Sequence, residues 1–96
     1  MRFIACYDID PEDFGKVIET DRERESSGRR VKTLLPPHFI ADASKGFTGF
    51  VIFESEDDSD IAQYVMEYSI SGKKNVRIYP IWESDKAFEI WEKLKK

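Results

Sequence analysis

Residues 45–54, with the sequence KGFTGFVIFE, decide the fold of this chain. Successive side chains of a β-strand point to opposite faces, so Phe47 and Val51 share one face while Phe50 and Ile52 share the other. Both faces are therefore apolar, which is typical of a central strand in a sheet that is covered on both sides. A chain of 96 residues can supply one such cover from its own helices. What supplies the second cover is the central question of this sequence.

The composition fits a single globular domain that spans residues 1–96. Hydrophobic residues make up 41% and charged residues 35%, which distinguishes the chain from a disordered one. The formal net charge of −4 argues against a general phosphate-binding surface. Cys6 is the only cysteine, so an internal disulfide and a metal site built from cysteines are both excluded.

The first residues carry no signal-peptide pattern, because the stretch RFIACYDID becomes acidic by residue 8. The longest apolar runs are far shorter than the roughly 18 residues of a membrane-spanning helix. We therefore expect a cytoplasmic protein that has no membrane partner.

Strand and helix signals alternate along the chain. We expect strands at residues 2–8, 31–42, 45–54 and 75–82, and helices at 10–25, 57–71 and from 84 onward. Asp10 and Pro11 are typical of a helix start, and Gly72 is typical of a helix end. The prolines at 36, 37 and 80 predict edge positions for the second and fourth strands, because proline cannot donate to a paired ladder.

The order β-α-β-β-α-β-α predicts an α+β fold, the ferredoxin-like βαββαβ sandwich with a four-stranded antiparallel sheet and an extra C-terminal helix. In this arrangement the first and third strands are central, which agrees with the positions of the prolines. Both helices before the last strand then pack on one face of the sheet. The other face is bare within one subunit.

A bare apolar face of several strands exceeds what soluble monomers normally expose. The C-terminal helix, a nucleic acid or a second copy of the sheet could cover it. We favour a second copy, which gives a two-fold homodimer with a cavity between or beside the sheets. The C-terminal segment has enough apolar area to take part in this contact through Trp82, Phe88 and Trp91. The buried face of its helix is expected to comprise Ala87, Ile90, Trp91 and Leu94.

The third strand also resembles the RNP1 motif of RNA-recognition motifs, which share the βαββαβ order. Residues 45–47 match its opening and residues 49–53 match its end, but Thr48 is inserted between them. Because side chains alternate, Phe47 and Phe50 then lie on opposite faces, whereas a stacking platform needs both on one face. We therefore do not expect nucleic acid as a partner.

His38 is the only histidine and the candidate catalytic residue. Histidine titrates near neutrality when unperturbed, so His38 in an inter-sheet cavity could act as a general base or polar anchor. A half-exposed position on an edge strand is the alternative. A four-residue turn would pair His38 with Val51, whereas a turn of three or five residues would reverse the face on which it lies.

The candidate ligand-binding residues are His38, Tyr7 and Trp82. If the Tyr7 hydroxyl is buried on the open face, it needs a hydrogen-bonding partner, which His38 or Glu54 could provide. Asp8 and Glu54 are otherwise expected at strand ends in water. One histidine and one cysteine do not make a persuasive metal site, and no phosphate-binding or dinucleotide-binding motif is found, so we expect no metal and no cofactor.

The whole pattern resembles the dimeric α+β barrel superfamily, and within it a family of short uncharacterised proteins classed as a domain of unknown function. The matching residues are 3–7, 31–34, His38, 46–57 and 78–81. The chain departs from the family pattern at Pro37, where the family places an aromatic residue before the histidine. The resemblance implies a dimer with a cavity on each sheet face. This fold is also called the dimeric α/β barrel. It implies no established reaction.

Our leading hypothesis is a homodimer that binds a small apolar or aromatic molecule between the sheet and the C-terminal helix, with His38, Tyr7 and Trp82 lining the cavity. The first alternative, implied by the resemblance, is a cofactor-independent monooxygenase or isomerase. The second alternative is a purely structural or regulatory dimer. The sequence leaves open whether the protein is an enzyme and which ligand it binds.

Overall fold

The computed structural model describes residues 1–28, 31–40 and 47–95. Its elements follow the order β1 (Arg2–Ile9), the 3-10 turn η1 (Pro11–Asp13), α1 (Phe14–Ser26), β2 (Lys32–Ile40), β3 (Phe47–Glu54), α2 (Asp58–Ser71), β4 (Lys73–Ile81) and α3 (Ser84–Leu94). This confirms the α+β fold with βαββαβ order and an extra C-terminal helix. Residues 41–46, which include the expected end of the second strand and the expected start of the third, lie outside the described residues.

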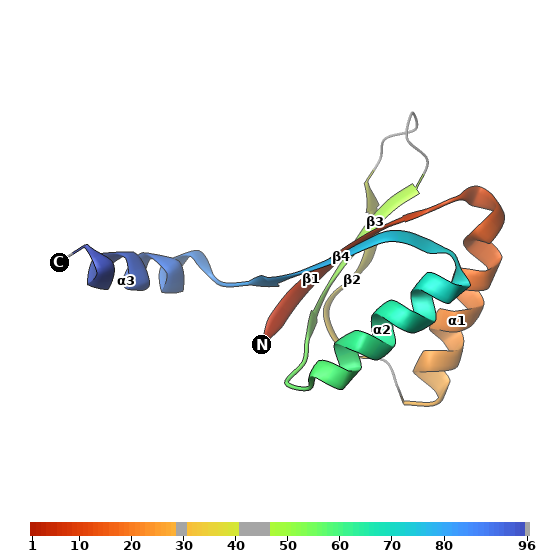
Figure 1. Ribbon diagram of the computed structural model, residues 1–96, viewed down its shortest axis with the longest axis horizontal. Helices are drawn as coiled ribbons and strands as arrows, with labels where there is room; N and C mark the ends of the chain where they lie inside the picture. Colours follow the sequence, from red (N-terminus) through yellow and green to blue (C-terminus); the bar gives the residue numbers. More distant parts are fainter. Residues whose placement is uncertain (29–30, 41–46, 96) are drawn as a thin grey trace.

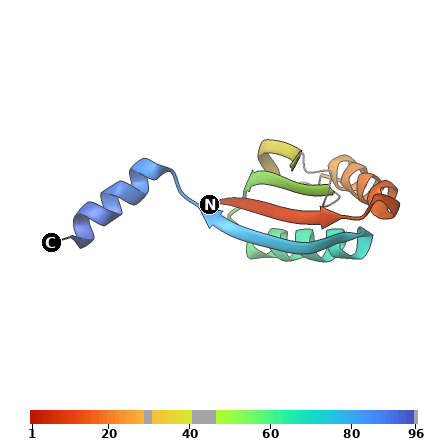
Figure 2. The same cartoon turned by 90° about the horizontal axis from the view of Figure 1, so that it is seen from above.

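The four strands form one antiparallel sheet in the order β2-β3-β1-β4. The apolar strands β1 and β3 are central, and the proline-containing strands β2 and β4 are at the edges, as the prolines predict. Helices α1 and α2 lie side by side on one face of the sheet (Figure 1). A view turned by 90° shows α3 standing apart from these two layers (Figure 2).

Local signals in the sequence explain where the helices begin and end. The Asp57 carboxylate accepts a hydrogen bond from the backbone N–H of Ser59 at 2.9 Å and so caps α2. The same bond lowers the pKa of Asp57. At the other end of α2, Gly72 adopts a φ of 121°, a conformation that side chains with a Cβ rarely adopt.

The hydrophobic core lies between the sheet and the helices α1 and α2. Its buried members are Ala5, Tyr7, Ile9, Val17, Val51, Phe53, Tyr64 and Tyr68. The Phe53 ring stacks against Phe3 at 5.6 Å and against Tyr64 at 5.7 Å between ring centroids. Every core residue from β1 and β3 has an odd number, so these odd positions define the face that the helices cover.

Helix α3 extends away from the rest of the molecule (Figure 1). The radius of gyration is 15.6 Å, compared with about 12.5 Å for a compact chain of this length. No side chain of α3 is buried within the described part of the chain. The expectation that Ala87, Ile90, Trp91 and Leu94 form a buried face is therefore wrong for a single chain. A cavity between the sheet and the C-terminal helix was expected in a homodimer, and within one chain α3 does not lie over the sheet.

Candidate functional site

We call the face of the sheet that lies opposite α1 and α2 the open face. Residues paired across antiparallel strands point to the same side, so the register assigns its members. They are Lys32, Leu35, His38 and Ile40 on β2; Thr48, Phe50, Ile52 and Glu54 on β3; Arg2, Ile4, Cys6 and Asp8 on β1; and Lys74, Arg77, Tyr79 and Ile81 on β4.

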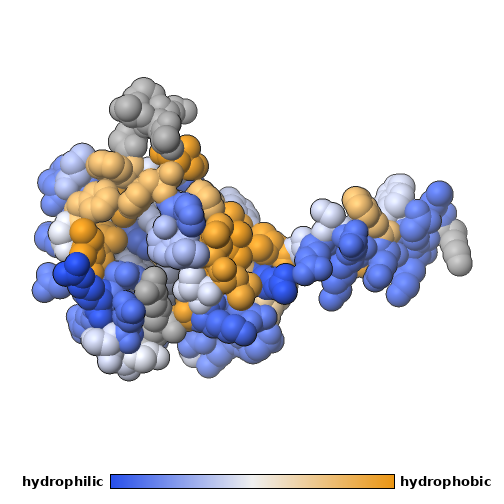
Figure 3. All heavy atoms as spheres, turned by 180° about the vertical axis from the view of Figure 1, so that it is seen from behind, coloured by the Kyte–Doolittle hydropathy of each residue, from blue (hydrophilic) through white to orange (hydrophobic). Residues whose placement is uncertain are grey.

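The middle of the open face is an apolar strip that crosses all four strands. Leu35, Ile52, Ile4 and Tyr79 are consecutive neighbours in the register. Tyr79 is 53% exposed, and the other three are half-buried in the single chain. From behind the view of Figure 1, hydrophobic side chains form a band on the body of the molecule that reaches the base of α3 (Figure 3). None of the described elements packs over this strip.

His38 lies on the open face, where its ring stacks on Phe50 with 5.7 Å between the ring centroids and an interplanar angle of 21°. His38 pairs with Phe50, one residue away from the Val51 partner that a four-residue turn would give. The register of β2 shifts on both sides of Leu35, next to the two prolines. These irregularities set the side of the sheet that His38 occupies.

The His38 ring is oriented by a contact with the backbone of its own strand, at Pro36. Its Nδ1 atom lies 2.5 Å from the carbonyl oxygen of Pro36. Because a carbonyl oxygen can only accept a hydrogen bond, Nδ1 carries the proton. In the neutral ring, Nε2 is then the acceptor, which is the form needed for a general base or for binding a hydroxyl donor.

Asp8 provides a fixed carboxylate on the open face. It accepts hydrogen bonds from the Thr48 hydroxyl at 2.8 Å and from the Asn75 side-chain amide at 3.0 Å. These two bonds lower the pKa of Asp8, and the Arg77 charge adds to the effect. The sequence predicted Asp8 at a strand end in water. It gave no sign of the Thr48 bond, which depends on the register, or of the Asn75 bond, which depends on the positive φ of 52° at Asn75.

Tyr7 lies on the covered face and not on the open face. Its side chain is 2% exposed, and its ring centroid is 3.6 Å from the Lys73 amino group. Burial raises the pKa of Tyr7 to about 12. His38 and Tyr7 therefore point to opposite sides of the sheet, and the expectation that they line one cavity in a single chain is wrong.

Trp82 is 64% exposed and follows β4 at the edge of the sheet opposite β2. It lines a groove of about 500 Å³ at the base of α3. An ion pair between Arg2 and Glu83, with 2.8 Å between nitrogen and oxygen, crosses this groove. Trp82 and His38 belong to opposite edges of the sheet, so one chain does not bring them together.

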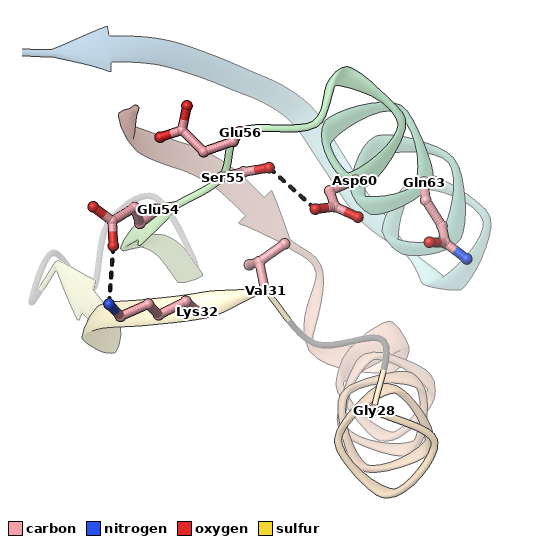
Figure 4. A pocket seen from close by; sticks show the side chains of 8 residues that line it. All are labelled: Gly28, Val31, Lys32, Glu54, Ser55, Glu56, Asp60 and Gln63. Atoms are coloured by element: carbon pink, nitrogen blue, oxygen red, sulfur yellow. Dashed lines mark hydrogen bonds and ion pairs between the residues drawn. The ribbon is translucent and has the colours of Figure 1, made fainter.

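A larger groove, of about 720 Å³, lies where the β2 and β3 ends meet the start of α2 (Figure 4). Its acidic side chains already have partners within the chain. Glu54 pairs with Lys32 at 3.1 Å, which lowers the pKa of Glu54, and Asp60 accepts a hydrogen bond from Ser55 at 3.1 Å. Over the described ranges, no group of His, Cys, Asp and Glu side chains has a metal-binding arrangement. We interpret this groove as a solvated surface.

The covered face encloses a second polar cluster, around Lys73. The Lys73 amino group lies 3.6 Å from the Tyr7 ring centroid and 3.7 Å from that of Tyr68, and it donates a hydrogen bond of 3.1 Å to the Tyr64 hydroxyl. Burial is the main cause that raises the pKa of Tyr64 as well. Three tyrosine side chains therefore stabilise one buried cation by cation–π contact and hydrogen bonding.

Arg24 extends this cluster into α1. It is 1% exposed, pairs with Glu67, and lies 5.4 Å from the Tyr68 ring centroid. The burial of Arg24 is unexpected, because it lies within the run DRERE at residues 21–25, which contains no apolar residue. The cavity beside the cluster holds about 20 Å³, room for about one water molecule. The cluster is a structural network and too small to admit a ligand.

No protein-family model matches the chain, and no curated protein matches it significantly. Among solved structures, it is similar to 5-chloro-2-hydroxyhydroquinone dehydrochlorinase (TftG) from Burkholderia phenoliruptrix, in complex with 2,5-dihydroxybenzoquinone. The two structures align with a TM-score of 0.61 and 14% sequence identity. The alignment covers 90% of this chain and 98% of the dehydrochlorinase chain. This likeness supports the ferredoxin-like α+β fold for this chain. The narrower resemblance to a family of short uncharacterised proteins finds no family-model match.

An antibiotic biosynthesis monooxygenase is also similar, with a TM-score of 0.44 at 15% identity over 85% of this chain and 98% of that one. Among the helices that the structure describes, none is long and apolar enough to cross a membrane.

Proposed function

We propose that the protein forms a homodimer through its open face and binds a small, planar, apolar or aromatic molecule there, beside His38. The observation that carries the proposal is the stacked pair of His38 and Phe50, which forms an aromatic shelf on a face that no described element covers. Binding sites for small molecules are mostly apolar and have a few placed polar groups. The open face has this composition.

The polar groups around the shelf define the ligand chemistry. The His38 Nε2 atom can accept a hydrogen bond from a ligand hydroxyl, because Nδ1 is engaged with Pro36. Arg77 lies on the opposite edge strand, too far away to contact the same small ring. A ring that carries a hydroxyl group fits the His38 acceptor. The dihydroxybenzoquinone in the complex of the similar dehydrochlorinase belongs to this chemical class, which supports the proposal.

A second copy of the chain is the cover that we propose for the open face. Stable protein–protein interfaces bury roughly 800 Å² per partner, and a four-stranded face supplies an area of that order. A two-fold arrangement also buries the same surface on both copies, as in most homodimers. In this account the ligand occupies the space left between the shelf and the second copy.

The binding proposal can be tested by calorimetric titration with 2,5-dihydroxybenzoquinone and related hydroxyquinones. We expect saturable binding that is weakened about tenfold in His38→Ala, because a ring contact and a hydrogen bond are lost. Met66→Ala is the control, since Met66 is 64% exposed on α2 and does not belong to the open face. An unchanged dissociation constant in His38→Ala would contradict the proposal.

Proton transfer is a second candidate function, favoured by the contact between His38 and Pro36. With Nδ1 protonated, Nε2 can take a proton from a carbon next to a ligand carbonyl, and the C–H electron pair then forms an enolate. The imidazolium proton exchanges with solvent, and return of a proton from His38 to another carbon completes an isomerisation without any oxidant or reductant. This step makes the protein a cofactor-independent isomerase.

The isomerase candidate predicts that the protein accelerates deuterium incorporation from D₂O into enolisable cyclic ketones, followed by NMR. His38→Gln should lose this acceleration while still binding the ketone. Equal exchange rates with wild-type protein, His38→Gln and buffer alone would leave ligand binding as the function and reject isomerisation.

A further inference from the structure

The sequence of α3 places all its apolar side chains on one side of the helix. At 100° per residue they fall within an arc of about 160°. The apolar stripe consists of Ala87, Phe88, Ile90, Trp91 and Leu94, and the opposite side carries Asp85, Lys86, Glu89, Glu92 and Lys93. Phe88 is 63%, Trp91 61% and Leu94 74% exposed. An isolated helix of 11 residues is marginal in water, so α3 requires a partner for its stripe.

The connection to α3 directs the helix away from its own sheet. Only Trp82 and Glu83 separate the end of β4 from the start of α3. Glu83 has an extended backbone and pairs with Arg2 at 2.8 Å, which holds the base of α3 beside the start of β1. For α3 to fold back over its own open face, this two-residue connection would have to reverse and the ion pair would have to break.

The open face matches the stripe in chemistry and in size. A helix of 11 residues is about 16 Å long, and the outer strands of a four-stranded sheet lie about 14 Å apart. The strip of Leu35, Ile52, Ile4 and Tyr79 crosses this whole width. Since one chain carries both surfaces and does not bring them together, two chains related by a two-fold axis can satisfy both surfaces at once.

We infer that the two copies exchange α3, so that the stripe of each α3 packs across the open face of the other copy. The exposed large side chains of the stripe and Trp82 offer on the order of 100 Å² each. Two arms and the two surfaces that they cover then bury on the order of 2,000 Å² in total, which is within the range of stable dimers. The occupant of the open face is thus the partner's helix and not the partner's sheet.

The exchange completes the ligand site, a consequence that rests on the proposed function. A helix laid across the open face forms a roof over the shelf of His38 and Phe50, and its aromatic side chains lie on the ligand side. Each pocket then has a floor from one chain and a roof from the other. A single chain has the shelf without the roof, so the site is incomplete without the second copy.

Cysteine cross-linking in the full chain tests the exchange directly. The single native cysteine, Cys6, lies on the open face next to Phe50. Cysteines are placed in the stripe by Phe88→Cys and Trp91→Cys, and on the polar side of the helix by the control Glu89→Cys. Each variant is mixed as ¹⁴N- and ¹⁵N-labelled chains, unfolded and refolded together, oxidised and digested. Mass spectrometry of the disulfide-linked peptides then separates links between chains from links within a chain.

We expect Phe88→Cys or Trp91→Cys to form a disulfide to Cys6 that joins labelled and unlabelled chains, at a yield at least tenfold above Glu89→Cys. Circular dichroism checks that each variant is folded. A link between chains in either Phe88→Cys or Trp91→Cys is sufficient to support the exchange. A dimer without such links, or with links only inside one chain, would overturn the exchange and leave the dimer in place. A monomer that binds phosphatidylserine vesicles through α3 would overturn the exchange and the dimer. Ligand titration of the wild-type protein would still test the binding proposal separately.

Discussion

The two faces of the sheet carry similar side chains but differ in what lies over them. On the covered face, Phe53 is fully buried between the rings of Phe3 and Tyr64. On the open face, Phe50 contacts the His38 ring at the edge of an uncovered strip. The same strand therefore contributes to one complete core and to half of another. This chain completes one core by itself, and in the proposed dimer a second copy completes the other.

The largest expected effect comes from truncating each phenylalanine in turn. Phe53→Ala should lower the free energy of unfolding by about 3–5 kcal/mol, because it leaves a cavity in a packed core. Phe50→Ala should cost less, and its cost should grow with protein concentration, because the contact is made to a second copy. Urea unfolding followed by circular dichroism at several protein concentrations measures both. If Phe53→Ala and Phe50→Ala lowered the free energy of unfolding equally at every protein concentration, the two faces would not differ in this way.

The polar cluster of the covered face predicts a loss of stability at high pH. Burial raises the pKa of Tyr7 to about 12, above the ordinary value of about 10 for tyrosine, so the unfolded chain loses this proton first. The stabilisation is fully present below pH 10 and is lost as the pH rises toward 12. The slope for one group is about 1.4 kcal/mol per pH unit. Unfolding measured between pH 8 and 12 should show a shallower decline in Tyr7→Phe.

Tyr64 shares the cluster and also has a raised pKa, so part of the decline should remain in Tyr7→Phe. An identical pH dependence in wild type and Tyr7→Phe would show that Tyr7 is accessible to water. The covered face would then be less closed than the structure indicates.

A glycine pair sharpens the comparison with effects of opposite sign. A Cβ added at Gly49 would lie 2.6 Å from Cε2 of the buried Tyr7 ring, so Gly49→Ala should destabilise by about 1–3 kcal/mol. At Gly15, in α1, no atom lies within 4 Å of an added Cβ, so Gly15→Ala should stabilise by about 0.5–1 kcal/mol. Thermal unfolding of both variants checks the signs. A neutral Gly49→Ala would mean that the Tyr7 ring can move aside.

The smallest effect concerns the fixed carboxylate of the open face. Thr48→Val removes a hydrogen bond to Asp8 and should cost about 1 kcal/mol at pH 7. Because the pKa of Asp8 is lowered in the folded state, its stabilisation is present above the unfolded pKa and is lost as the pH falls through the folded pKa. The difference between wild type and Thr48→Val should therefore narrow in acid. A difference that is constant from pH 7 to pH 2 would contradict this role for Asp8.

The sequence predicted the element order and the edge strands because prolines and helix caps act locally. The prolines at 36, 37 and 80 lie on β2 and β4, and Gly72 ends α2 as expected. The same reasoning could not assign the covered face, because β1 is apolar on both parities. Tyr7 was therefore considered for the wrong side of the sheet.

The site residues depend on features that a single sequence does not determine. The face of His38 depends on the register shifts beside Leu35, and the burial of Arg24 and Lys73 depends on rings supplied by α2. The apolar stripe of α3 was visible in the sequence, but no described element of the same chain covers it. An apolar periodicity identifies which side of a helix is to be buried, but it does not identify the surface that packs against that side.

The central claim is that a second copy completes the open face and covers the stripe of α3. Static light scattering on the wild-type chain, at several concentrations down to the low micromolar range, tests it most directly. The account predicts a mass near twice 11.2 kDa throughout. A mass of 11.2 kDa at every concentration, with the fold intact by circular dichroism, would contradict it.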